Sequence, residues 1–172
     1  MTDATEAVVN PVDTMNRRLG AARLGLHMRG LFATAWLLSL APAHAESSDD
    51  FNGYRGRVVY LDFWASWCTP CRQSFPWMQA MKDTYERQGL SVIAVNLDRH
   101  REDADRFLAK FRPNFDVRFD SEGQTADRFK VHGMPTSVII DRRGVRRYTH
   151  IGFRPVDLGA YESELRNILA ER

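Results

Sequence analysis

The two cysteines of this sequence, Cys68 and Cys71, stand at the junction between an apolar segment and an amphipathic one. Residues 58–63 form an apolar run broken only by Asp62, which is typical of a buried strand. Beyond the cysteines, apolar residues recur every three or four positions, the period of one helical face, and Gly89 follows as a plausible end of that helix. These residues are Phe75, Met78, Met81 and Tyr85. The segment therefore predicts a strand followed by a helix, with the Cys-x-x-Cys pair opening the helix.

The remainder of the chain alternates further strands with helices. Apolar segments predict strands at residues 91–96, 115–119, 137–140 and 145–151, and helical periodicity marks residues 104–111, 126–129 and 158–169. This order predicts an α/β fold with a central, mostly parallel sheet and helices on both faces. The last two strands flank the turn 141–144, so they should form an antiparallel edge hairpin.

The position of the cysteines has direct chemical consequences. Backbone N–H groups at a helix N-terminus stabilise negative charge, so Cys68 can be held as the thiolate, which is the nucleophilic form. Cys71 lies one helical turn further on and can resolve a mixed disulfide. Pro70 fits the first turn, where its missing N–H would have no helical partner. The predicted centre is a redox-active disulfide that needs no other cofactor.

The cysteine pair has three alternative uses: a zinc site, the handling of Cu(I) and a structural disulfide. A zinc site would need a second pair of ligands, but the sequence has only two cysteines and its histidines lack ligand spacing, so no resident metal is expected. Transient Cu(I) handling by a metallochaperone-like protein remains an alternative, because thiolates suit that ion. A purely structural disulfide is disfavoured, since closing so short a loop removes little chain entropy.

Two separated motifs resemble the thioredoxins. The segment Asp62-Phe63-Trp64-Ala65-Ser66-Trp67-Cys68-Thr69-Pro70-Cys71 is similar to their active site, and Pro76 falls where they kink the same helix. Downstream, Gly133-Met134-Pro135-Thr136 resembles their cis-proline loop. The two motifs leave room for a central strand and helix beyond a minimal thioredoxin. Together with an export signal, that insertion resembles the TlpA, ResA and CcmG-like branch of thiol-disulfide oxidoreductases.

The resemblance implies roles for individual residues. Asp62 would accept the proton of Cys71, although a carboxylate that merely reaches water at the strand end is the alternative reading. Pro135 would face the cysteines in a cis peptide bond with Met134. Substrate contacts would come from the residues flanking the two motifs, while Trp64 belongs to the core. These contact residues are Trp67, Thr69, Pro70, Met134 and Thr136. Thioredoxins place a buried lysine where this sequence has Ala94.

The first 45 residues read as an export signal. Arginines precede an apolar run at residues 31–40, and Ala43-His44-Ala45 forms a small-residue cleavage pattern. The apolar run is too short for an ordinary membrane span, yet an uncleaved anchor stays open as an alternative. We therefore expect a signal peptide at residues 1–45, a thioredoxin-like domain at residues 46–172, and a periplasmic location.

Charge and composition narrow the partners. A formal net charge of +2, without a basic stripe, disfavours nucleic-acid binding. The arginines around Gly144 are interpreted as a solvated hairpin tip: Arg142, Arg143, Arg146 and Arg147. The resemblance to the TlpA, ResA and CcmG-like branch implies a monomeric dithiol reductase of protein disulfides, recharged by a membrane electron donor of the DsbD or CcdA kind. An oxidase or isomerase on the same fold is the second hypothesis.

Overall fold

The computed structural model describes residues 49–171, and its elements follow the order predicted from the sequence. The strands are β1 (Val58–Trp64), β2 (Leu90–Asn96), β3 (Asp116–Phe119), β4 (Thr136–Ile140) and β5 (Arg146–Ile151). The α-helices are α1 (Thr69–Tyr85), α2 (Arg101–Phe111), α3 (Gln124–Phe129) and α4 (Leu158–Ala170). Short 3-10 helices are η1 (Asp49–Tyr54), η2 (Glu86–Gln88) and η3 (Pro155–Asp157). The predicted export signal at residues 1–45 lies outside the described residues.

The strands form one five-stranded sheet in the order β3-β2-β1-β4-β5. β1, β2 and β3 run parallel, whereas β4 pairs antiparallel with β1, and β5 pairs antiparallel with β4. The predicted closing hairpin is therefore confirmed, and Gly144 takes the left-handed conformation in its turn, with φ of 85°. β3 and α3 lie between α2 and β4, where the sequence predicted a central insertion.

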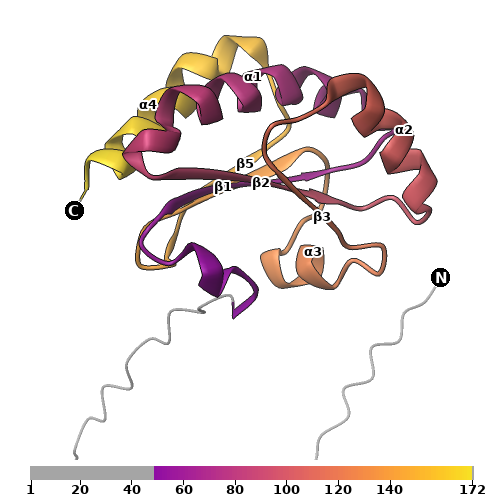
Figure 1. Ribbon diagram of the computed structural model, residues 1–172, viewed down its shortest axis with the longest axis horizontal. Coiled ribbons are helices and arrows are strands. Elements are labelled where there is room, and N and C mark those ends of the chain that lie inside the picture. The colour runs from indigo at the N-terminus through magenta and orange to yellow at the C-terminus, as the bar shows by residue number, and fades with distance from the viewer. Residues whose placement is uncertain (1–48, 172) are drawn as a thin grey trace, which may run out of the picture. The chain divides into compact units, whose positions relative to one another are not determined.

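Helices cover both faces of the sheet, as predicted. Figure 1 shows α1, α2 and α4 on one face and α3 with η1 on the other. The first face buries an aromatic cluster that includes Trp64, Phe75 and Phe107, while Phe63 and Phe129 pack on the second. Because β1 is central and covered on both faces, all seven of its residues are buried. That explains why its sequence is a continuous apolar run and not an alternating one.

The interpretation of the arginine-rich hairpin as a solvated tip holds for Arg143 and Arg146, which are exposed, but is wrong for Arg142 and Arg147. Arg142 is half-buried, and its guanidinium donates hydrogen bonds to four backbone carbonyls that come from other segments. These carbonyls belong to Gly56, Gln88, Leu169 and Glu171. Arg147 is bound to the buried Asp141 and, through both terminal nitrogens, to Glu171. The hairpin tip is therefore a clamp that joins the start of β1, η2 and the end of α4.

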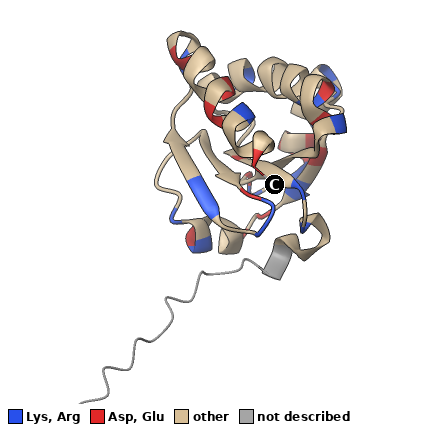
Figure 2. Cartoon of the chain, turned by 90° about the vertical axis from the view of Figure 1, so that its left-hand side faces the viewer, with Lys and Arg blue, Asp and Glu red and all other residues tan. Residues whose placement is uncertain are grey.

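The remaining charges are dispersed. Figure 2 shows acidic and basic residues interspersed along the helices on the side that it draws. None of the helices within residues 49–171 is long and apolar enough to cross a membrane.

Candidate active site

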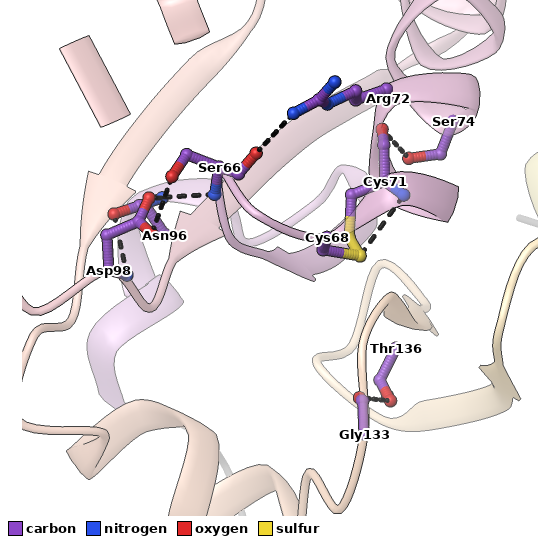
Figure 3. The surroundings of a disulfide bond; sticks show 9 residues. All are labelled: Ser66, Cys68, Cys71, Arg72, Ser74, Asn96, Asp98, Gly133 and Thr136. Atoms are coloured by element: carbon purple, nitrogen blue, oxygen red, sulfur yellow. Dashed lines mark hydrogen bonds between the residues drawn. A yellow bond between two sulfur atoms is a disulfide. The ribbon is translucent and has the colours of Figure 1, made fainter. Parts of the chain in front are cut away.

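The cysteine pair lies where β1 gives way to α1, and it is closed as a disulfide with Cα atoms 5.3 Å apart. Cys68 is the N-cap residue of α1, and its Sγ accepts a hydrogen bond from the backbone N–H of Cys71 at 3.3 Å (Figure 3). A side chain in this position satisfies one of the N–H groups that a helix leaves open at its start. The backbone therefore offers Cys68 Sγ the partial positive charge that stabilises a thiolate.

A cysteine that attacks a substrate has to be accessible, so the roles assigned from the sequence predict an exposed Cys68 and a shielded Cys71. Cys71 is fully buried, as predicted, but Cys68 is only 4% exposed, so its predicted exposure is wrong for the disulfide form. The exposed feature beside it is Trp67, which is 68% exposed and lies directly before the pair. Thr69 and Pro70 are also exposed.

Asp62 is buried in the centre of the sheet and does not reach water. Its side chain belongs to a residue that is 1% exposed, and Oδ2 has no hydrogen-bond partner among the described residues. Burial raises the pKa of this carboxyl well above its ordinary value, because the charged form loses its hydration. The strand-end alternative is therefore excluded. Ala94 is its register partner on β2, so the neighbour on that side carries no polar side chain.

The proline loop faces the disulfide. The Met134–Pro135 bond is cis, as predicted, and Figure 3 shows Gly133 and Thr136 across from Cys68. The loop is held at both ends: Thr136 Oγ1 donates to the Gly133 carbonyl, and the Gly152 N–H donates to the Pro135 carbonyl, each at 2.7 Å. Met134 is half-buried and packs against the core. The fold thus brings the two predicted motifs together.

A polar network beneath the loop before Cys68 was not found from the sequence. Asp98 is buried and accepts three hydrogen bonds, from the backbone N–H and hydroxyl of Ser66 and from the side-chain amide of Asn96 (Figure 3). Arg72 adds a bond from its guanidinium to the Ser66 carbonyl at 3.4 Å. The available signal was a pair of polar residues at the carboxyl end of β2, the end at which parallel strands gather functional groups.

No metal cluster accompanies the cysteines in the part of the chain that the structure describes. Residues 49–171 contain no group of three or more His, Cys, Asp and Glu side chains placed to hold a metal ion. The chemistry that the arrangement supports is thiol-disulfide exchange: a disulfide at a helix N-terminus, a buried carboxyl on the preceding strand and a proline loop opposite.

Comparison with known proteins places this geometry among relatives. Residues 56–145 match a family model described as thioredoxin-like. Thiol-disulfide oxidoreductase ResA of Geobacillus kaustophilus is 33% identical over 93 residues, covering 54% of this chain and 53% of that protein. Thioredoxin-like protein YneN of Bacillus subtilis is 36% identical over 102 residues, covering 57% and 58% respectively. The chain therefore spans little more than half the length of these curated relatives.

Solved structures of other proteins are also similar to this chain. A protein from Chlorobium tepidum, provisionally named thiol:disulfide interchange protein DsbE, is 52% identical with a TM-score of 0.68, covering 69% of this chain and 84% of that one. StoA from Bacillus subtilis is 24% identical with a TM-score of 0.56, covering 63% and 82%, a likeness that concerns the fold alone.

Proposed function

This chain belongs to the thioredoxin-like family, and from that premise we propose that it is a periplasmic thiol-disulfide oxidoreductase that reduces protein disulfides through Cys68 and Cys71. The observation that carries the proposal is the position of the pair. Cys68 caps α1, beside an exposed tryptophan and opposite the Pro135 loop. Such a placement suits attack on a disulfide and has no evident purpose in a structural bridge.

The reaction proceeds by two exchanges. In the dithiol form, the Cys68 thiolate attacks one sulfur of the substrate disulfide, forms a mixed disulfide and releases the first substrate thiolate. Cys71 then gives its proton to the Asp62 carboxylate and attacks Cys68 Sγ. The new Cys68–Cys71 bond releases the second substrate thiolate. Two electrons have then passed from the protein to its substrate.

Substrate contacts come from both sides of the disulfide. Trp67, Thr69 and Pro70 are exposed around the pair and offer an apolar contact surface. Across from them, the half-buried Met134 precedes Pro135 and can pair through its backbone with an extended segment of the partner. Thr136 is buried in β4 and paired with both neighbouring strands, so it supports the loop from behind. This arrangement suits an unfolded or loosely ordered polypeptide that carries a disulfide.

The names of the relatives support the proposed chemistry, and the composition of the leader supports the proposed location. Among the relatives, ResA carries the name thiol-disulfide oxidoreductase, and the segment at residues 1–45 has the composition of an export signal. An exported reductase faces an oxidising compartment and needs an external supply of electrons. We therefore propose a membrane donor of the DsbD or CcdA kind and a monomeric protein acting on disulfide-bearing partners.

The test combines turnover with trapping. The dithiol form should reduce insulin, and Cys71→Ser should accumulate mixed disulfides with its partners, because the attack through Cys68 proceeds but the release step cannot. The matched control is Cys68→Ser, which should trap none. Trapping by Cys68→Ser and not by Cys71→Ser would reverse the assignment of roles. Failure to reduce insulin, together with copper retained after anaerobic purification, would favour the metallochaperone alternative instead.

A further inference from the structure

Asp62 has no evident route by which to exchange a proton with solvent. Its residue is 1% exposed, and its Oδ2 lacks a hydrogen-bond partner among the described residues. On β2 it pairs with Ala94, whose side chain cannot carry a proton. A carboxyl that takes a proton from Cys71 must nevertheless lose it before the site returns to its starting state. The route has to be sought on the other side of β1.

A row of polar residues crosses the sheet on that side. Asp62 pairs with Ser137 on β4, and Ser137 pairs with His150 on β5. Residues directly opposite each other in an antiparallel pair project from the same face of the sheet, about 5 Å apart at their Cβ atoms. Asp62, Ser137 and His150 therefore share one face. Tyr60, two residues before Asp62 on β1, projects from the same face of the sheet and is also buried.

His150 connects the row of polar residues to α4 through two contacts. Its ring packs on Tyr161 with centroids 4.3 Å apart, and its Nε2 lies 2.7 Å from Glu164 Oε2. The contact is close but is not aligned as a hydrogen bond, because Oε2 still lacks a hydrogen-bond partner. The side chains of His150 and Glu164 are 14% and 30% exposed. Exposure thus rises along the row from Asp62 to Glu164, which reaches water.

Asp62 and His150, the residues on either side of Ser137 in the row, each have a buried polar atom without a hydrogen-bond partner among the described residues. These atoms are Oδ2 of Asp62 and Nδ1 of His150, and Ser137 stands between the two residues in register. Buried polar atoms without partners are uncommon and costly in folded proteins. Neither atom is hydrogen-bonded to the Ser137 hydroxyl in the disulfide form, so side-chain rotation has to complete the row. A hydroxyl between a carboxyl and an imidazole can then accept from one and donate to the other.

We propose that Ser137, His150 and Glu164 form the proton exit of Asp62, an inference that rests on the proposed oxidoreductase function. The Asp62 carboxyl passes its proton to the Ser137 hydroxyl, which gives its own proton to His150 Nδ1. The imidazole then rotates until its Nε2–H points at the Glu164 carboxylate. It releases that proton to the carboxylate, which delivers it to water. Only protons move. The other titratable groups around the row are Tyr60 on β1, Tyr148 on β5 and Tyr161 on α4.

The experiment compares proton release with thiol oxidation in one stopped-flow trace. The full-length dithiol protein is mixed at about pH 8 with the aromatic disulfide dithiobis-nitrobenzoate, whose product thiolates remain ionised. Closing the Cys68–Cys71 bond then yields two aromatic thiolates and delivers the protons of the dithiol to solvent. Thiolate absorbance reports oxidation, and a pH indicator in weak buffer reports protons.

In the wild type, the two signals should rise together. In His150→Gln and Glu164→Gln, oxidation should keep its rate while the last proton lags by roughly ten-fold or more, because a positioned acid-base group has been removed. The matched control is Glu162→Gln on the same helix, since that carboxylate accepts from Tyr85 and lies outside the row. Its signals should still coincide.

Coincident signals in His150→Gln, or a wild type in which the proton of Cys71 does not reach solvent, would overturn the proton exit. Ser137→Ala provides a second variant with a small change in volume, so the test does not depend on the folding of one protein. Because the aromatic disulfide is not a protein substrate, the result is independent of insulin reduction. A wild type that fails with insulin would refute the proposed function and leave the proton measurement interpretable.

Discussion

At the scale of single residues, Asp62 is the group least suited to its surroundings. Every residue of β1 is buried, and this carboxyl lies among them without a hydrogen-bond partner for Oδ2 among the described residues. Loss of hydration raises its pKa well above the ordinary value. A raised pKa strengthens the affinity of the carboxylate for a proton, which is the property a proton acceptor needs.

The raised pKa of Asp62 makes stability depend on pH with a definite sign. Between the unfolded and the folded pKa values the folded protein binds more protons, so its free energy of unfolding falls as pH rises through that window. Asp62→Asn removes the free-energy cost of holding a charged carboxylate in the buried strand. The variant should match the wild type near pH 3 and exceed it near pH 8, by about 1.4 kcal/mol for each unit separating the two pKa values. Urea unfolding at several pH values measures this difference.

The control for Asp62 is an exposed carboxyl. Asp105→Asn changes the same group on the surface of α2, where Asp105 pairs with Arg101, and should show no such divergence. If Asp62→Asn remained less stable than the wild type at pH 8, the carboxylate would be serving an unrecognised structural contact.

At the scale of elements, the junction between β1 and α1 depends on the end of β2. Leu97 donates its backbone N–H to the Trp64 carbonyl, and Asp98 holds Ser66 by both its N–H and its hydroxyl. The loop that presents Cys68 is therefore anchored to the neighbouring strand. Its geometry is fixed before any substrate arrives, which reduces the cost of orienting the attacking sulfur.

Asp98→Ala should weaken this junction. The change leaves the buried donors of Ser66 and Asn96 without their acceptor, so the free energy of unfolding should fall by roughly 2 kcal/mol or more. Insulin reduction should slow as the loop loosens. The matched change Asp105→Ala, at an exposed ion pair, should alter stability by no more than about 0.5 kcal/mol. Equal effects of the two variants in thermal and urea unfolding would show that the anchor is dispensable.

At the scale of the whole molecule, the redox centre is held by segments that lead directly into the central strands of the sheet. The disulfide is attached to the central strand, the proline loop leads into β4, and the Arg142 clamp joins the distal hairpin to α4. We propose that Asp62 contributes to the direction of transfer, because its carboxylate, when charged, opposes the formation of thiolates beside it. A less stable thiolate favours the disulfide form and hence a reducing protein.

The direction of electron transfer can be measured by equilibration with glutathione. We expect the Cys68–Cys71 couple to lie on the reducing side, near the potentials of reducing thioredoxin-like proteins, at about −200 mV or below. Asp62→Asn should shift the potential upward, since the repulsive charge is removed. A wild-type value around −120 mV, as for strong oxidants, would contradict the reductase and favour the disulfide-forming alternative.

Much of this protein follows from local sequence. The apolar run of β1, the period of α1 and the turn at Gly144 each depend on neighbouring residues, so their predicted positions agree with the structure to within a few residues. The same holds for the two cysteines at the helix N-terminus, because the strand, the pair and the helix are contiguous in the chain.

Only the tertiary structure decided which distant groups meet. The row from Asp62 through Ser137 to His150 depends on strand register, and the Arg142 clamp depends on how η2 and α4 end. Register is set by packing across the sheet, so Asp62 and Ser137, which are 75 positions apart, become neighbours without any local signal. For the same reason, nothing local in the sequence distinguishes Asp98 and Arg142 from charged surface residues. In the folded chain, Asp98 accepts hydrogen bonds from Ser66 and Asn96, and Arg142 donates hydrogen bonds to backbone carbonyls of other segments.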